Sequence, residues 1–255
     1  MTPVPVLSTL PVPRRSSTGS PDRLFTLLVL AIGAVSLLFY AFPGVDVAVS
    51  RWFYDTVDGF VLADSPPLRT LRASSTWVMA GVLLLALLRL VCSALGRRLT
   101  GKGARQSVWL ISGLAIGPGL LVNGVLKAHW GRPRPVATDV FGGEAPFQTV
   151  WVVSDWCDRN CSFVSGEAAA AAWLVAAALI APRPIRTAAT ALAALYATAL
   201  SINRIAFGGH YLSDVLLAWL LSGLVFLLLH RLIVARRAGG AGPSAPPQLA
   251  GRDRP

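Results

Sequence analysis

A small group of ionisable residues in the second half of the chain has the types and spacing that phosphate chemistry needs. His210 and Asp214 are four residues apart at the predicted start of a helix, so their side chains lie on one face. The carboxylate can bind one imidazole nitrogen and leave the other free as a nucleophile or base. Cations that could neutralise phosphate oxygens stand near the ends of other predicted helices: Lys127, Arg132, Arg134 and Arg204. Together these residues favour a phosphate ester as substrate.

A third feature is a predicted helix start at Ser165 and Gly166. The free backbone N–H groups and the positive end of the helix dipole can face an anion there. Glu167 follows in the same turn. It could take part in the chemistry or simply be a helix-start charge that the dipole stabilises, and Asp214 has the same alternative. Lys127, Arg132 and Arg134 could likewise be interfacial anchors.

The composition indicates that these residues belong to a membrane protein. Of the 255 residues, 54% are hydrophobic and only 14% are charged, and the mean hydropathy is +0.60, which excludes an ordinary soluble domain. A spanning helix needs about 20 apolar residues. Six runs qualify, two of them short and alanine-rich: 24–42, 73–95, 107–126, 165–181, 187–203 and 212–234. We therefore expect an all-α bundle of six transmembrane helices, with the alanine-rich ones in its interior.

The distribution of charge predicts which way the bundle faces. Six spans place both ends of the chain on one side, together with 14 of the 23 lysines and arginines and only Asp22 and Asp253 as anions. By the positive-inside rule this side is cytoplasmic. The net charge of +11 is thus explained by topology, and no nucleic-acid partner is expected. The candidate site residues fall on the external side.

The same reading divides the chain into one domain and two tails. Residues 1–21 and 238–255 are rich in Pro, Gly, Ser and Arg without periodicity, and we expect disordered cytoplasmic tails there. Residues 22–237 form the membrane domain. Its first run lacks a small-x-small cleavage site and is interpreted as a retained anchor.

Two external segments carry further signals. In VDVAVSRWFYD, the residues Val45, Val49, Trp52 and Phe53 repeat at helical spacing with charges between them, as in a helix lying at the interface. This helix could be an aromatic-belt anchor or a lid. In the long segment 127–164, Cys157 and Cys161 are close enough for a disulfide or could be two free thiols. Their spacing is no zinc pattern, and no metal site is expected.

The spacing of the candidate residues also resembles that of a known family. Lys127, six residues, Arg134-Pro135; then Ser165-Gly166; then Arg204, five residues, His210, three residues, Asp214 is similar to the three-part signature of the type-2 phosphatidic acid phosphatases, which are related to the vanadium haloperoxidases. The resemblance implies an integral membrane phosphatase without metal or cofactor. Lys127, Arg134, Arg204, Ser165 and the amide of Gly166 would hold the phosphate. His210 would attack phosphorus and form a phosphohistidine, with Asp214 orienting it.

One position departs from the family pattern. The usual middle motif is Pro-Ser-Gly-His, whereas this chain has Val164-Ser165-Gly166-Glu167. In the family that histidine protonates the leaving group, which makes Glu167 the natural replacement as general acid. The surrounding CxxNCSFVSGEA resembles a bacterial branch with lipid A phosphatase-like members.

The resemblance implies a bacterial inner-membrane enzyme whose site faces the periplasm. Its substrate would be a lipid phosphate monoester or diphosphate in the external leaflet. A lipid phosphotransferase remains an alternative, as does a non-catalytic lipid-binding or transport relative. A transporter would carry charges at mid-span, whereas the charges of this chain cluster at helix ends. The oligomeric state is not predicted.

Overall fold

The computed structural model describes residues 20–99 and 101–235, with the side chains of residues 20–22 left out. Within these ranges the regular structure is helical, and the β-structure amounts to two isolated bridges. The all-α prediction is therefore confirmed. The calls for tails at 1–21 and 238–255 lie almost wholly outside the described residues.

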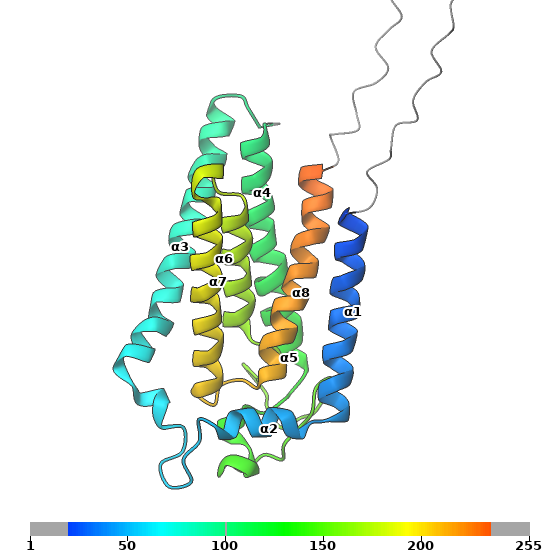
Figure 1. The fold of residues 1–255 in the computed structure, drawn as a ribbon, viewed down its shortest axis with the longest axis vertical. Coiled ribbons are helices and arrows are strands. Elements are labelled where there is room, and N and C mark those ends of the chain that lie inside the picture. The colour runs from blue at the N-terminus through cyan, green and yellow to red at the C-terminus, as the bar shows by residue number, and fades with distance from the viewer. Residues whose placement is uncertain (1–19, 100, 236–255) are drawn as a thin grey trace, which may run out of the picture.

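The chain runs up and down between the two ends of an elongated bundle (Figure 1). One short helix, α2, lies across the lower end of that view, where α1 ends and α3 begins. The long third segment is α-helical at both ends and π-helical in the middle. The elements are α1 Ser20–Ala41, α2 Gly44–Arg51, η1 Val61–Asp64, α3 Pro66–Leu95, α4 Lys102–Leu114, η2 Ala115–Leu126, α5 Lys127–His129, η3 Pro135–Ala137, η4 Asp139–Phe141, α6 Gly166–Leu179, α7 Arg183–Ala206, α8 Leu212–His230 and η5 Arg231–Ala235.

Five helical segments of the described residues are long and apolar enough to cross a membrane. They are Arg23–Ala41, Pro66–Leu95, Lys102–His129, Arg183–Ala206 and Leu212–Ala235. The sixth expected span is α6, whose 14 residues cover only about 21 Å at 1.5 Å per residue, less than the roughly 30 Å of a bilayer core. The prediction of six spans is thus confirmed for five of them.

The alanine-rich sequence of α6 explains its place in the bundle. Eight of its 14 residues are buried, five of them the consecutive alanines 168–172. Small side chains let neighbouring helices approach closely. Accordingly α6 packs against both α7 and α8, which is the interior position expected from the sequence. The other alanine-rich span, α7, is only 17% buried over its apolar window, so the expectation of an interior position is wrong for α7.

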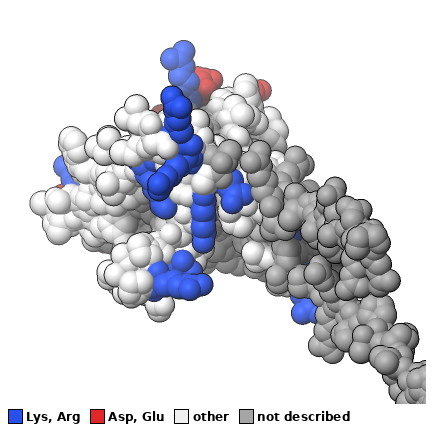
Figure 2. Space-filling view, turned by 90° about the horizontal axis from the view of Figure 1, so that it is seen from above, with Lys and Arg blue, Asp and Glu red and all other residues white. Residues whose placement is uncertain are grey.

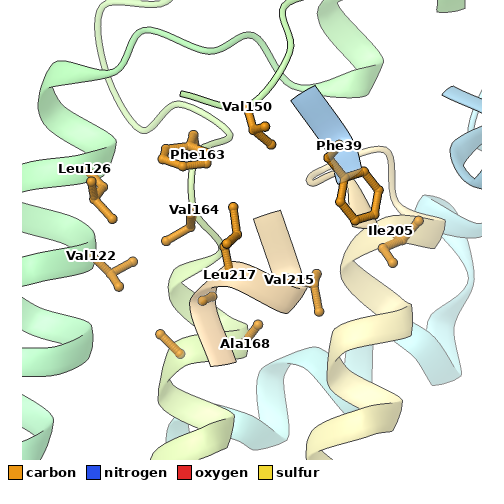
Figure 3. Close-up of a cluster of buried hydrophobic side chains, with 12 residues drawn as sticks. Phe39, Val122, Leu126, Val150, Phe163, Val164, Ala168, Ile205, Val215 and Leu217 are labelled. Atoms are coloured by element: carbon orange, nitrogen blue, oxygen red, sulfur yellow. The ribbon is translucent and has the colours of Figure 1, made fainter. Parts of the chain in front are cut away.

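The main apolar cluster lies inside the bundle, next to the end that α2 crosses. Figure 3 shows its side chains converging from α1, η2, α6, α7 and α8. Several members are next in sequence to a candidate site residue: Leu126 precedes Lys127, Val164 precedes Ser165, Ile205 follows Arg204 and Val215 follows Asp214. Burial of these neighbours fixes the backbone at each helix end, and therefore the position from which each polar side chain extends.

Basic side chains gather at the opposite end of the bundle. Figure 2 views that end from above, and lysines and arginines dominate its charged surface. Exposed members stand where α3 ends and where α4 and α7 begin: Arg97, Arg98, Lys102, Arg183 and Arg186. The candidate site is therefore at the end away from this basic surface.

Candidate active site

The predicted site residues come together at the end of the bundle where α2 lies. Lys127 is in α5, Ser165 to Glu167 open α6, Arg204 is in the last turn of α7, and Asp214 is in the first turn of α8. Arg134 and His210 stand in the loops before η3 and α8. The hydropathy pattern thus located these helix ends correctly. His129 is exposed, as are the acidic loop residues 139, 144, 155 and 158.

His210 is held by a backbone carbonyl rather than by the expected carboxylate. Its side chain is buried, with the residue 1% exposed, and Nδ1 lies 2.7 Å from the carbonyl oxygen of Ser162. A carbonyl only accepts, so this contact places the proton on Nδ1 and leaves Nε2 with a free lone pair. Asp214 Oδ2 is 3.9 Å from Nδ1, which is too far for a hydrogen bond. Nε2 is therefore the ring nitrogen of His210 that is available to a ligand.

The surroundings also keep the imidazole of His210 uncharged. Burial, followed by the positive charges of Lys127, Arg204 and Arg134, lowers the pKa of His210 well below its usual range. A neutral imidazole is the form that can attack phosphorus.

Asp214 belongs to a buried charge network behind the histidine. Its oxygens accept hydrogen bonds from Ser162 Oγ at 2.5 Å and from the backbone N–H of Tyr211 at 2.9 Å. Arg132 Nη1 lies 2.6 Å from Asp214 Oδ1, and Arg132 Nη2 lies 2.9 Å from Asp46 Oδ2. Asp214 thus contacts the surroundings of His210 at two points: Ser162, whose carbonyl holds the imidazole, and the backbone N–H of the neighbouring Tyr211.

Arg132 is the centre of this network, although it stands off the family motif. Its side chain is 0% exposed and lies between the two carboxylates. Burial disfavours a charged guanidinium, but the charges of Asp214 and Asp46 outweigh that cost and raise the pKa of Arg132. Asp46 also accepts hydrogen bonds from the backbone and hydroxyl of Ser213.

This network gives α2 a role that its sequence pattern did not suggest. The expected interfacial helix is present, and its Trp52 cap is 78% exposed. Its buried face, however, carries Asp46 and Ser50, one turn apart and both 0% exposed. Through Asp46, α2 is joined to Arg132, which also pairs with Asp214.

Two of the phosphate-binding candidates share one loop residue as their partner. Lys127 Nζ donates to Asn160 Oδ1 at 3.1 Å, and Arg134 donates from Nε and Nη2 to the Asn160 carbonyl at 3.1 and 2.8 Å. Asn160 lies inside the small ring that the disulfide Cys157–Cys161 closes, which settles the choice between disulfide and free thiols. The oxygens of Asn160 thus accept from both of these candidate cations.

The remaining motif cation, Arg204, faces Glu167. Its Nε lies 3.4 Å from Glu167 Oε2, an ion pair whose geometry does not make a hydrogen bond, since both atoms are buried without a hydrogen-bond partner. The other oxygen, Oε1, accepts from Arg72 Nε at 3.0 Å. Both oxygens of Glu167 therefore face nitrogens that can only donate. A Cβ at Gly209 would collide with Arg204 Nη2, so a side chain there would displace the guanidinium group.

The start of α6 has the form expected of an anion site. Ser165 is the N-cap, and its hydroxyl accepts from the Ala168 N–H at 3.3 Å. A Cβ at Gly166 would lie 2.7 Å from Asn123 Oδ1, so a larger residue there would displace the Asn123 side chain. Asn123 in turn donates to the Pro118 carbonyl at 2.7 Å within η2. This rare π-helical stretch precedes Lys127 directly and thus sets the position of its side chain.

An apolar groove of about 450 Å³ opens beside these groups, between α3, η2 and α6. Its polar end contains Lys127 and Glu167, and its walls include Met79, Leu83 and Pro118. A groove with apolar walls and an ammonium group at its polar end can take a hydrocarbon tail whose headgroup is anionic. Within the described residues, no three His, Cys, Asp or Glu side chains gather in a way that could hold a metal ion.

Four contributors escaped the sequence-based prediction: Asp46, Arg72, Asn160 and Ser162. Asn160 had a usable signal, because it stands between two cysteines close to the candidate helix start. Asp46 and Arg72 had none, since each contacts a partner more than 80 residues away in sequence.

The chain is similar in sequence to a protein family and to individual phosphatases, and similar in fold to a solved structure. The profile of the PAP2 superfamily matches residues 107–238. A lipid A 4'-phosphatase of Rhizobium etli is 39% identical over 234 residues, covering 86% of this chain and 90% of that protein. A lipid A 4'-phosphatase of Francisella tularensis subsp. novicida is 41% identical over 133 residues, which is 50% of this chain and 60% of its own length. The crystal structure of a PAP2-type phosphatidylglycerolphosphate phosphatase from Bacillus subtilis has a similar fold, with a TM-score of 0.50 and 24% identity over 83% of this chain and 94% of that one.

Proposed function

The chain belongs to the PAP2 superfamily and is a membrane lipid phosphatase, and on this premise we propose that it hydrolyses a lipid phosphate monoester through a covalent intermediate at His210. The observation that carries the proposal is His210 itself, buried, uncharged and oriented by the Ser162 carbonyl with Nε2 free. Lys127, Arg134 and Arg204 are the cations that act on this imidazole, so a phosphate bound to them would lie within reach of it.

In the first step, His210 Nε2 attacks phosphorus while the bond from phosphorus to the lipid oxygen breaks. The cations, the Ser165 hydroxyl and the Gly166 amide stabilise the charge on the other phosphate oxygens. In the second step, water attacks the phosphohistidine, the bond from phosphorus to nitrogen breaks, and inorganic phosphate leaves.

Glu167 is our candidate for moving the proton. When a phosphate binds to the guanidinium groups of Arg72 and Arg204, it replaces Glu167 as their counterion. A phosphate monoester arriving as the monoanion can then pass its proton to Glu167, which gives it to the lipid oxygen as that oxygen leaves. In the second step the carboxylate accepts a proton from the attacking water.

Glu167→Gln tests this role because the amide can still bind an arginine but cannot transfer a proton. We expect a large loss of kcat on a lipid phosphate and a smaller loss on an activated aryl phosphate. Equal losses on both substrates, or none, would reduce Glu167 to a partner of the two arginines.

We further propose that the lipid is lipid A and that its 4'-phosphate is removed. The support is the sequence identity of 39% to two Rhizobium lipid A 4'-phosphatases, over 86% and 77% of this chain. The test is phosphate release by the purified chain from lipid A, phosphatidic acid, phosphatidylglycerophosphate and a polyprenyl diphosphate. His210→Ala should abolish release, at about 10⁴-fold or more, and His129→Ala should retain most of it. Comparable losses in both variants would exclude His210 as the nucleophile.

The same panel separates the alternatives. Loss of lipid phosphate with transfer to a second lipid, instead of release as inorganic phosphate, would identify a phosphotransferase. No turnover of any lipid, with binding retained, would identify a non-catalytic relative. A trapped, acid-labile phosphohistidine that disappears with His210→Ala would support the covalent step directly.

We also propose that the site faces the periplasm in a bacterial inner membrane, with the sixth crossing made through α6. The support is the basic surface at the other end of the bundle. In a Cys92→Ser background, an impermeant thiol reagent applied from outside should label Glu144→Cys but not Arg98→Cys, two exposed positions at opposite ends of the chain's spans. The reverse labelling pattern would place the site in the cytoplasm.

A further inference from the structure

The site contains an arginine that lies outside the three motifs of the family signature. Arg72 is in the second turn of α3, before the residues matched by the superfamily profile. Its side chain is 47% exposed, and Nε donates to Glu167 Oε1 at 3.0 Å. Arg72 therefore meets the site where this chain has glutamate in place of the family's histidine.

Glu167 joins Arg72 to the motif cations. One of its oxygens faces Arg72 and the other faces Arg204, so a single carboxylate serves two guanidinium groups. Arg134 is near as well, since burial and then the charge of Arg72 lower the pKa of Arg134. Two arginines thus share one carboxylate with Arg134 nearby, and a second anion would relieve the mutual repulsion of the three.

Arg72 lies on α3 before the residues of that helix that line the apolar groove, on the side of Glu167. Met79 and Ala80 follow it by seven and eight residues, which puts them two turns further along the same face of α3. Both line the groove, as does Leu83. A lipid whose chain lay along this face would have its headgroup at the level of Arg72.

We propose that Arg72 is a substrate-binding residue that exchanges Glu167 for an oxygen of the lipid phosphate. The inference rests on the proposed function for the identity of the phosphate carrier. In the free protein, Glu167 holds the guanidinium at the site. When the phosphate enters, Arg72 becomes the fourth cation around it, beside Lys127, Arg134 and Arg204. Arg72 and Glu167 thus form a pair, in which the carboxylate keeps the arginine in place between substrates.

The chain provides a matched control on the same helix. Arg69 is one turn before Arg72 and forms an ion pair with Asp64 at 3.1 Å, with both side chains mostly exposed. If the Arg72 pair were only a similar surface contact, the two arginines would behave alike on removal.

The experiment compares Arg72→Ala, Arg72→Lys and Arg69→Ala in the full chain, purified in detergent. Inorganic phosphate is titrated by calorimetry, and KM and kcat are measured on the lipid phosphate. We expect Arg72→Ala to weaken phosphate binding and raise KM by about tenfold to a hundredfold, as for loss of a charged hydrogen bond. Arg72→Lys should recover part of the loss, and Arg69→Ala should match the wild type.

Equal phosphate affinity in Arg72→Ala and Arg69→Ala would overturn the proposal. The thermal unfolding midpoints of the two variants should agree, so that a folding defect is not mistaken for lost binding. The phosphate titration needs no turnover. A chain that binds phosphate through Arg72 but releases none from any lipid would therefore refute the proposed hydrolysis while supporting the arginine's role.

Discussion

The two sides of His210 treat charge in opposite ways. Behind the imidazole, Asp46, Arg132 and Asp214 are fully buried, and short hydrogen bonds join them to each other and to nearby serines. In front of it, the arginines at 72, 134 and 204 are partly exposed or imperfectly paired, and their partners are one carboxylate and one loop carbonyl.

This difference suggests that the groups behind His210 support the fold, whereas those in front of it are free to bind a ligand. A charge that is saturated inside the fold has nothing left to offer a ligand, so the rear network can only hold the histidine loop in place. A charge with a replaceable partner can exchange it for a phosphate oxygen. Substitutions behind the histidine should therefore act first on stability, and those in front should act first on activity.

Arg132→Ala should have the largest effect. It leaves two buried carboxylates without their cation, and breaking a buried ion pair in this way costs about 3–5 kcal/mol of folding free energy. Thermal unfolding of the purified protein should show a strong destabilisation, accompanied by loss of activity. Arg132→Lys, which keeps the charge but not the two-pronged geometry, should fall in between. A fully stable Arg132→Ala protein would contradict the supporting role of the network.

Arg134→Ala should show the reverse pattern. Among the residues that the structure describes, Arg134 donates hydrogen bonds only to the Asn160 carbonyl in a loop, so the unfolding free energy should change by less than about 1 kcal/mol. Loss of a donor that stabilises transition-state charge should lower kcat/KM by about 100-fold or more. Steady-state kinetics and unfolding of the same preparation measure both the change in kcat/KM and the change in unfolding free energy. Destabilisation as large as that of Arg132→Ala would erase the distinction between the two sides.

The pH profile should sharpen the comparison through His210. As the proposed nucleophile, His210 must be neutral, and the pKa of His210 lies well below its usual range because of burial and the cations in front. The acid limb of kcat/KM should thus fall well below pH 6.5, with activity lost as the pH drops through the lowered pKa. Removing one positive charge with Arg134→Gln should raise this pKa and move the limb to higher pH. An unchanged limb would mean that another group governs it.

Asn160→Ala should have the smallest effect. It removes the side-chain contact with Lys127 but keeps the backbone carbonyl that Arg134 uses. One net hydrogen bond of about 1 kcal/mol corresponds to a change of roughly fivefold in kcat/KM. Cys161→Ser, which opens the ring around Asn160, should disturb both contacts and cost more. Equal effects of the two variants would mean that the ring does not position the carbonyl.

The sequence allowed prediction of what lies on helix ends but not of what joins separate helices. Lys127, Ser165, Arg204 and Asp214 each follow or precede an apolar run, so hydropathy located them and the motif spacing related them. The shortness of α6 was less visible, because alanine fits both a span and a buried core helix.

Long-range partners were beyond such patterns. Arg132 was recognised as basic, yet its two carboxylates come from positions 46 and 214, and no periodicity relates these three positions. The orientation of His210 by the Ser162 carbonyl was equally hidden, because a backbone acceptor has no residue signature. Asp214 at four residues' distance looked like the partner, but its oxygens were already used elsewhere.

The buried carboxylate of Asp46 has a consequence for transplanting this chemistry. The residues that the superfamily profile matches begin at 107, and α2 lies well before them. A graft of the matched helices into another scaffold would bury Arg132 with one counterion instead of two, and an uncompensated charge in that position opposes folding. The smallest portable catalytic unit of this protein therefore starts no later than α2.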